Sequence, residues 1–387
     1  MRILFLNYEF PPIGGGGANA NAYLFQHYAN NPNLVVDCVT STFDRQDQTE
    51  KFAENVRLYR LAVGKRALHF WTQREVLVWL RQARRKVREL VSQHDYDVCH
   101  AFFGFPSGLI AWCYRDQFPY IVSLRGSDVP GFNPRFAYQY IFLKPLFRPI
   151  WRQATSVIAN SQGLKVLANK FMPDLSVGVL PNGVDHQAFS TAIAGARVPQ
   201  RILCVSRLVE RKGVQHLIEA MPAIVTSFPE VSLQIVGEGN LSAELSEQCR
   251  SLGVHEHVEF LGYVPHDNLP ELYQKAELFV QPSFYEGMSN TVLEAMASGL
   301  PIIATGEGGR EELLKDNATI TQYNDPASLA ESVKSILSNK QILKTMGQES
   351  RQIAEQYSWE TVAQSYVDIY TSLMESRPAS RVPRREV

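Results

Sequence analysis

The sequence predicts an α/β protein built from two doubly wound domains, and three observations support this fold class. The chain has 387 residues, which is more than one hydrophobic core usually organises. Short apolar runs typical of buried strands alternate with stretches of helical spacing, over residues 1–185 and again over residues 201–357. Residues 186–200 contain four Ala, one Gly and one Pro and are expected to link the two domains.

The composition is that of an ordinary globular protein, with 45% hydrophobic and 20% charged residues. A net charge of −1 gives no general reason to expect nucleic acid as a partner. Five cysteines without C-x-x-C spacing favour a reducing compartment and no zinc site. The apolar run in residues 1–9 is too short for a signal peptide, and no stretch is long enough to span a bilayer. We therefore expect a cytoplasmic protein, either free or peripheral at the inner face of the cytoplasmic membrane.

Apolar runs place the strands of the first domain. The polar residues 41–55 are expected to form a loop, and residues 71–92 have apolar side chains at helical spacing, which predicts a helix. The strands are expected at Arg2–Asn7, Val35–Val39, Val56–Tyr59, the first residues of Asp97–Gly108, Tyr120–Leu124, Ser156–Asn160 and Val177–Leu180.

A glycine-rich loop follows the first strand. Phe10–Gly17 ends in four consecutive glycines, and residues 18–28 after it have helical spacing. A strand, a glycine-rich loop and a helix in this order can cradle a phosphate, because backbone N–H groups point at the ligand. The loop lacks both G-x-G-x-x-G spacing and a Walker lysine, so neither a dinucleotide site nor a P-loop is supported. A flexible turn is the alternative.

The second domain is expected to open with a strand at Arg201–Val205, followed by a basic loop that contains Arg207 and Lys212. Both cations would lie at the carboxyl edge of the sheet, and Arg211 between them is expected to face solvent. Fixed cations there would stabilise negative charge that develops on a bound ligand by about 3–4 kcal/mol per good contact. Further strands are expected at Val231–Val236, before Gly237-Glu238-Gly239, and at Val258–Leu261, before Val264.

The stretch from residue 276 to residue 304 carries the strongest functional signal in the chain. It predicts strands at Leu278–Gln281 and Ile302–Ala304, with a short helix between them that Ser289 or Asn290 can cap. The start of this helix would point out of the carboxyl edge of the sheet, where doubly wound sheets bind ligands. Its free N–H groups and partial positive charge suit a phosphate.

Two carboxylates bracket this helix start. Glu286 lies in the loop and Glu294 lies inside the helix, more than two turns away. A carboxylate beside a phosphate is repelled, whereas one that faces a ribose or hexose diol accepts two hydrogen bonds. Gly287 lets a ligand approach the backbone closely. The residues therefore predict a nucleotide-sugar, with phosphate at the helix start and sugar hydroxyls at both glutamates.

The Glu286-x7-Glu294 pattern, with its flanking Pro-Ser and Glu-Ala-Met-Ala-Ser-Gly-Leu-Pro, resembles the donor signature of the family-4 retaining glycosyltransferases, also called glycosyl transferases group 1. The resemblance is strongest over residues 201–312, where Gly306–Gly309 and Glu311-Glu312 resemble a further family segment. It implies the GT-B fold, with two Rossmann-like domains facing each other across a cleft. It also implies a C-terminal helix at residues 358–376 that crosses back to the first domain, before a flexible tail at residues 377–387.

For function, the resemblance implies transfer of a hexose from a UDP- or GDP-sugar to a glycan or lipid-linked acceptor, with retention of anomeric configuration. The pathway would be cell-surface polysaccharide or glycoconjugate biosynthesis, without a metal or cofactor. The implied catalytic residues are Arg207 and Lys212, which bind the diphosphate, and Glu286, which meets the sugar. The implied donor-binding residues are Gly15, Gly16, Gly237, Gly239, Val264, Gly287, Met288, Ser289, Asn290 and Glu294.

The acceptor side departs from the family pattern at two positions. Family members often have His-x-His where this sequence has His100 and then Phe102, and they often have a histidine where Arg125 stands. We expect His100, Arg125 and Asp128 to lie on the acceptor side. The alternatives are a core histidine and an ordinary salt bridge between Arg125 and Asp128.

Two basic stretches, residues 71–92 and 135–152, contain aromatic residues and little or no acid. Helices of this kind favour anionic lipid surfaces, which predicts membrane contact by the acceptor domain. A solvated face over an aromatic core is the alternative for both stretches.

Two other functions fit the same residues. A sugar-nucleotide epimerase shares this architecture and needs no acceptor, but should keep a histidine and acids close to the hexose. A non-catalytic protein that binds nucleotide-sugars as a partner would be consistent with the departures at Phe102 and Arg125.

Overall fold

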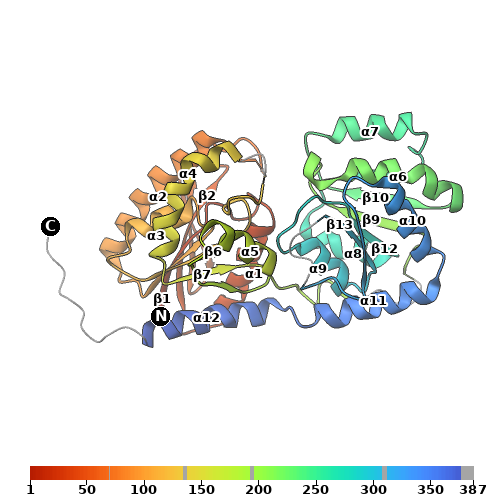
Figure 1. Ribbon diagram of the computed structural model, residues 1–387. Coiled ribbons are helices and arrows are strands. Elements are labelled where there is room, and N and C mark those ends of the chain that lie inside the picture. The colour runs from red at the N-terminus through yellow and green to blue at the C-terminus, as the bar shows by residue number, and fades with distance from the viewer. Residues whose placement is uncertain (69, 134–136, 192–195, 307–311, 376–387) are drawn as a thin grey trace. The chain divides into compact units, whose positions relative to one another are not determined.

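A computed structural model describes the chain except residues 69, 134–136, 192–195, 307–311 and 376–387. The chain folds into two compact units (Figure 1). Unit 1 contains residues 1–160 and 164–180 and the segment that begins at Trp359, and unit 2 contains residues 161–163 and 181–358. Unit 2 thus begins a few residues before residue 185, the predicted end of the first domain. The predicted tail, most of the segment 306–312, Arg135 and part of the predicted linker lie outside the described residues.

Unit 1 is built on a mostly parallel sheet. Its strand order is β3-β4-β2-β1-β5-β6-β7-β8 within the described residues. All neighbouring strands are parallel except β3 and β4, which are antiparallel. The strands are β1 (Arg2–Leu6), β2 (Val35–Thr42), β3 (Gln48–Ala53), β4 (Val56–Ala62), β5 (Val98–Phe102), β6 (Tyr120–Leu124), β7 (Ser156–Ala159) and β8 (Val177–Val179).

Helices cover both faces of this sheet (Figure 1). Helix α3 contacts both α2 and α4, and these three helices lie side by side on one face, whereas α1 and α12 pack against each other on the other. The stacked rings of Tyr23 and Trp359, with centroids 5.3 Å apart, join α1 to α12. The helices are α1 (Gly16–Ala29), α2 (Gln73–Gln93), α3 (Ser107–Cys113), α4 (Ala137–Arg152), α5 (Gln162–Phe171) and α12 (Trp359–Glu375).

The prediction of a loop over residues 41–55 is wrong, because β2 extends to Thr42 and β3 forms an edge strand. Strand β3 pairs with β4 through backbone contacts that run from Gln48 opposite Arg60 to Ala53 opposite Val56. The side chains of β3 are exposed or half-buried on both faces. An edge strand of this kind lacks the apolar alternation by which a strand is found in a sequence.

Unit 2 contains a fully parallel sheet with the strand order β11-β10-β9-β12-β13-β14 in the described part of the chain. The strands are β9 (Arg201–Val205), β10 (Ser232–Val236), β11 (Val258–Gly262), β12 (Leu278–Gln281), β13 (Ile302–Thr305) and β14 (Ala318–Thr321). The helices are α6 (Val214–Ser227), α7 (Ser242–Ser251), α8 (Leu269–Lys275), α9 (Asn290–Ala297), α10 (Pro326–Leu337) and α11 (Lys340–Ala354), with the short 3-10 turns η2 (Glu210–Lys212) and η3 (His266–Asn268).

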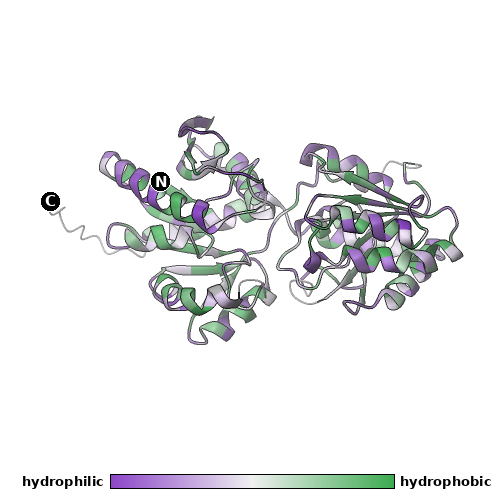
Figure 2. Ribbon diagram, turned by 90° about the horizontal axis from the view of Figure 1, so that it is seen from above, coloured by the Kyte–Doolittle hydropathy of each residue, from purple (hydrophilic) through white to green (hydrophobic). Residues whose placement is uncertain are grey.

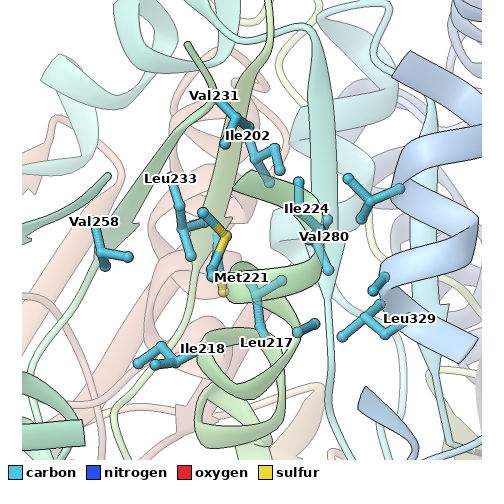
Figure 3. Packing of buried hydrophobic residues seen from close by; sticks show 14 of the residues in the cluster. Ile202, Leu217, Ile218, Met221, Ile224, Val231, Leu233, Val258, Val280 and Leu329 are labelled. Carbon is cyan, nitrogen blue, oxygen red and sulfur yellow. The ribbon is translucent and has the colours of Figure 1, made fainter. Parts of the chain in front are cut away.

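The sheet of unit 2 is buried on both faces. On one face, Leu217 and Met221 of α6 pack among Leu233, Val280 and Leu329 (Figure 3). On the other face, α8 and α9 cover the opposite side chains of β9, β12 and β13. Figure 2 shows this arrangement as mostly green strands between helices that carry purple segments. Each fully buried large apolar side chain contributes about 1.5–3 kcal/mol, so this core fixes the loops at the ends of the strands.

The strand order of unit 2 reverses between β9 and β12. From β9 the chain moves outward through β10 and β11, and from β12 it moves outward on the other side through β13 and β14. Because all these strands are parallel, their carboxyl ends share one edge of the sheet. Ligands of doubly wound proteins bind beside such a reversal, so a site is expected at the loops after β9 and β12. None of the described helices has the length and hydrophobicity needed to cross a membrane.

Candidate functional site

The loops at the carboxyl edge of the unit 2 sheet are joined by backbone hydrogen bonds. The loop after β9 donates from Leu208 N to Glu238 O at 2.9 Å, which ties it to the loop after β10. On its other side, Phe284 N donates to Arg211 O at 2.9 Å, which ties it to the loop after β12. Gly237 N donates to Gly262 O at 2.8 Å and so ties the loop after β10 to the last residue of β11. The edge is therefore a continuous, fixed scaffold for side chains.

Glycines make this close packing possible. A Cβ on Gly237, which has a φ of +128°, would lie 2.0 Å from the carbonyl oxygen of Ser206, and a Cβ on Gly239 would lie 2.0 Å from that of Leu208. A side chain at either position would separate the two loops. This backbone contact explains why glycine stands at both positions, and their predicted part in donor binding remains a prediction.

Lys212 and Glu286 meet between the loops after β9 and β12. The Lys212 ammonium donates a hydrogen bond to Glu286 Oε1, and both side chains are mostly buried, with 13% and 19% of their surface exposed. Burial raises the pKa of Glu286, but the charges of Lys212 and Arg211 outweigh it and hold that pKa below its ordinary value. Burial and the nearby charges of Arg211 and Arg207 lower the pKa of Lys212 against the opposing effect of Glu286. Basic residues of one loop therefore surround a carboxylate that stays ionised.

Helix α9 begins beside this pair, as the sequence predicts. Ser289 is the N-cap, and its hydroxyl accepts from Val292 N at 3.4 Å and from the Gln281 amide at 2.7 Å. Asn290 is the first residue of the helix and accepts a hydrogen bond from the Asn182 amide at 2.6 Å. Gly287 and the side chain of Met288 are buried, the latter in the apolar core under α9.

Glu294 lies in the middle of α9 and is 7% exposed. Its Oε1 lies 3.0 Å from Nε2 of His266, and its Oε2 accepts from the hydroxyl of Tyr273 at 2.9 Å. Val264 lies two residues before His266 in the loop that follows β11, half-buried against the core that includes Tyr273. Neither His266 nor Tyr273 was among the residues predicted for the site. The one available signal was the position of His266 two residues after Val264, a residue that the resemblance implied to bind the donor.

The residues predicted for the first domain lie in unit 1. Gly15 is the N-cap of α1, and Gly16 is the first residue of this helix after the loop that follows β1. Whether these glycines approach a donor remains a prediction.

His100 is fully buried in unit 1. Its Nδ1 lies 2.6 Å from the hydroxyl of Tyr370 on α12, and its Nε2 lies 2.7 Å from Oγ of Ser123 on β6. Burial and the charge of Arg125 lower the pKa of His100, so the ring is neutral. This geometry favours the core histidine over a residue that touches an acceptor.

Arg125 and Asp128 lie in the loop after β6. Asp128 is buried and accepts hydrogen bonds from the backbone N–H groups of Gly104 at 2.6 Å, Arg125 at 3.0 Å and Gly126 at 2.8 Å. The guanidinium of Arg125 lies over the ring of Phe102, 4.3 Å from its centroid. Asp128 therefore shapes the loop, and the cation–π contact with Phe102 holds Arg125.

The structure thus brings the donor residues predicted for the second domain to one edge of one sheet. Arg207, Lys212 and Glu286 lie together, α9 begins next to them, and Glu294 lies deeper in α9 with Val264 nearby. The cations and the helix start are suited to a diphosphate. The carboxylates, one on either side, are suited to hydroxyl groups. Among the described residues, no group of three or more His, Cys, Asp or Glu side chains is placed to hold a metal ion.

Two family matches cover most of the chain. Residues 194–353 match the family described as Glycosyl transferases group 1, and residues 14–188 match Glycosyltransferase Family 4. The first match lies over the sheet of unit 2 and the loops at its carboxyl edge. The second lies over most of unit 1.

Individual relatives match along nearly their full length. An uncharacterized glycosyltransferase of Methanocaldococcus jannaschii is 28% identical over 97% of this chain and 99% of its own. A GDP-mannose-dependent α-(1-6)-phosphatidylinositol monomannoside mannosyltransferase of Mycobacterium tuberculosis is 26% identical over 95% of this chain and 97% of its own. Among solved structures, the Anabaena protein HepE in complex with UDP and glucose superposes with a TM-score of 0.76 at 20% identity, over 96% of this chain and 100% of that one.

Proposed function

Because the chain belongs to glycosyltransferase family 4 and has the GT-B fold, we propose that it moves a hexose from a UDP- or GDP-sugar to a glycan or lipid-linked acceptor, with retention of anomeric configuration. The reaction would serve the biosynthesis of cell-surface polysaccharide or glycoconjugate. The observation that carries the proposal is the Lys212–Glu286 pair beside the start of α9, with Glu294 further along the same helix.

In the proposed reaction, the bond between the anomeric carbon and the diphosphate oxygen breaks. A bond from the acceptor oxygen to that carbon forms on the same face, and the acceptor proton passes to the leaving phosphate. Lys212 and Arg207 stabilise the charge that develops on the diphosphate, together with the start of α9. In the free protein, Glu286 accepts a hydrogen bond from Lys212 and so positions it. When the Lys212 ammonium also binds the diphosphate, Glu286 is placed to accept hydrogen bonds from the hexose hydroxyls. Side chains and the helix dipole then neutralise the diphosphate without a metal.

The choice of base stays open between uracil and guanine. By its name, the M. tuberculosis relative uses GDP-mannose, and the HepE structure contains UDP and glucose. Both nucleotides offer the same diphosphate and ribose to Arg207, Lys212 and Glu294, so these residues do not discriminate between them.

A thermal-shift panel of UDP- and GDP-hexoses tests the donor, because a ligand that binds only the folded protein raises its apparent stability by mass action. We expect one nucleotide class to raise the melting temperature. Incubating that donor with the protein and no acceptor then separates the alternatives. Release of hexose supports a transferase that uses water slowly, whereas conversion to an epimeric nucleotide-sugar would identify an epimerase. No shift with any donor would contradict the proposal.

We also propose that unit 1 contacts an anionic membrane surface through α4. Three apolar side chains of this helix lie outward at helical spacing, with Tyr138 82%, Ile141 63% and Phe142 82% exposed. The exposed cations Lys144 and Arg148 follow on the same helix, whose sequence contains no Asp or Glu. An apolar ridge next to cations fits the boundary between anionic headgroups and acyl chains.

The neighbouring helices extend the basic surface. Tyr114, at the end of α3, donates to Arg84 O of α2 at 3.1 Å, and Trp112 of α3 donates to the Gln153 amide just after α4 at 2.9 Å. The exposed Arg84 and Arg88 of α2 therefore belong to the same layer as α4. Residues 1–180 contain 21 Lys and Arg against 13 Asp and Glu, whereas residues 181–387 contain 17 against 26. The positive charge of the chain is thus concentrated in the part that carries α4.

A further inference from the structure

The Glu294 carboxylate is held between two side chains from different elements. We propose that His266 and Tyr273 are positioning residues, which fix Glu294 so that its remaining acceptor sites face the ribose 2′- and 3′-hydroxyls of the donor. This inference rests on the proposed function, because it takes the ligand to be a nucleotide-sugar.

The Glu294 carboxylate can accept more hydrogen bonds than its two protein partners donate. An ionised carboxylate has about four acceptor sites, two on each oxygen. Oε1 uses one of them for Nε2 of His266 at 3.0 Å, and Oε2 uses one for the hydroxyl of Tyr273 at 2.9 Å. One site is left on each oxygen, and a vicinal diol supplies two donors. With both protein contacts in place, the unused capacity of Glu294 matches the ribose.

Aromatic packing holds the two partners of Glu294 in place. Tyr273 is fully buried on α8, with its ring centroid 5.6 Å from that of Phe189 and 5.7 Å from that of Phe279. The ring of His266, in η3, lies edge-on to the same Phe189 with centroids 5.3 Å apart. Phe189 therefore contacts both partners. The Tyr273 ring cannot turn away from Glu294 without disturbing the core, and the half-buried His266 ring packs against the same Phe189.

Tyr273 also contacts the first turn of α9. The Tyr273 hydroxyl also lies 3.3 Å from the backbone oxygen of Thr291, in the first turn of α9. One side chain thus contacts both the carboxylate proposed for the ribose and the helix start proposed for the diphosphate. Tyr273 therefore sets the distance between these two subsites. The site is then selective for nucleotides whose ribose and diphosphate are separated by that distance.

Calorimetric titration with UDP, GDP and their 2′-deoxy forms tests the inference. A hydrogen bond to a charged group changes affinity by about tenfold or more, so the wild type should prefer the ribonucleotide over its 2′-deoxy form by at least about tenfold. Tyr273→Phe and His266→Leu should reduce this preference to about threefold or less. His266→Gln keeps an N–H donor at a similar position and should retain most of the preference. In turnover, both disruptive variants should raise the donor KM and leave kcat within about threefold.

Two matched variants control for general damage. Tyr114→Phe removes a buried tyrosine hydrogen bond in unit 1, and His257→Leu removes a histidine next to the amino end of β11, where Nδ1 lies 3.0 Å from Val231 O. Both should keep the ribose preference of the wild type. An unchanged preference in folded Tyr273→Phe and His266→Leu would overturn this inference alone. Failure of the wild type to bind either nucleotide would overturn the proposed function and this inference with it.

Discussion

The ammonium of Lys212 and the carboxylate of Glu286 form an ion pair between the loops after β9 and β12. These strands are neighbours in the sheet, although the two residues are 74 positions apart in the chain. The pair lies where the strand order of the unit 2 sheet reverses. In the proposed reaction Lys212 would bind the diphosphate, and Glu286 holds its ammonium in position in the free protein.

Replacing Lys212 by Ala should lower kcat by about 10²–10³-fold, because the leaving diphosphate loses a fixed cation. Steady-state turnover with the donor that the thermal-shift panel selects would measure this loss. Lys334→Ala is the matched control, since Lys334 pairs with Glu331 on the outer face of α10 and should leave kcat unchanged. Normal turnover by a folded Lys212→Ala protein would remove the leaving-group role.

Replacing Glu294 by Ala should weaken donor binding by about 1.5–3 kcal/mol, because a charged acceptor for the ribose is lost. Isothermal titration of the nucleoside diphosphate measures the change directly. Glu271→Ala, which removes an exposed acid of α8 that pairs with Lys275, should bind like the wild type. Equal affinities for Glu294→Ala and the wild type would refute the ribose contact.

The His266–Glu294 pair should make stability depend on pH. Burial lowers the pKa of His266, but the hydrogen bond and charge of Glu294, with the charges of Asp267 and Asp185, outweigh burial and raise it. A raised pKa in the folded state means that the pair stabilises fully below the ordinary histidine value of about 6.5 and loses this effect as pH rises through the raised pKa. Urea unfolding of the wild type and His266→Gln should therefore differ more at about pH 6 than at about pH 8.5. A difference that grows with pH would contradict the assignment.

Replacing His100 by Ala should destabilise unit 1 by about 2–4 kcal/mol, because it leaves a cavity and removes the partner of both Tyr370 and Ser123. Urea unfolding monitored by circular dichroism would measure this. Gln187→Ala, which changes an exposed residue of unit 2, is the control and should leave the free energy of unfolding unchanged. Unchanged stability together with a raised acceptor KM would restore the acceptor role for His100.

Combining Ile141→Ser and Phe142→Ser should reduce binding to vesicles of about 70% phosphatidylcholine and 30% phosphatidylglycerol by at least about fivefold, because two exposed apolar side chains no longer enter the interface. Co-sedimentation measures the bound fraction. Val166→Ser removes an exposed apolar side chain of α5 and should bind like the wild type. Equal binding by the double variant, or no binding by the wild type, would exclude α4 as the contact.

Sequence patterns were most informative for the central strands. Tyr120–Leu124, Arg201–Val205 and Leu278–Gln281 have the predicted bounds, because parallel strands buried on both faces appear as continuous apolar runs. The edge strands β3 and β14 were not predicted, since their side chains are exposed or half-buried except for Thr321 and form no such run. The N-cap of α9 was predicted because a capping side chain, here that of Ser289, accepts a hydrogen bond from a residue only three positions later in the chain.

The partners of the site residues were harder to predict. Lys212 and Glu286 were both expected near a diphosphate, but their direct pairing depends on how two loops meet across the sheet. His266 and Tyr273 reach Glu294 from different elements, 28 and 21 residues away, and no local pattern records this contact. No local pattern predicts the partners of His100 either, because its hydrogen bonds are to side chains of β6 and of α12 near the end of the chain.

The most direct test of the proposed activity is proton NMR of the sugar released from the selected donor, without acceptor, during the first minutes of reaction. UDP- and GDP-hexoses of the common kind are α-linked, so a retaining transferase that uses water should release the α-hexose first, with the β form appearing later by mutarotation. Lys212→Ala should release it far more slowly. Release of the β-hexose first, or no release with any donor, would contradict the account.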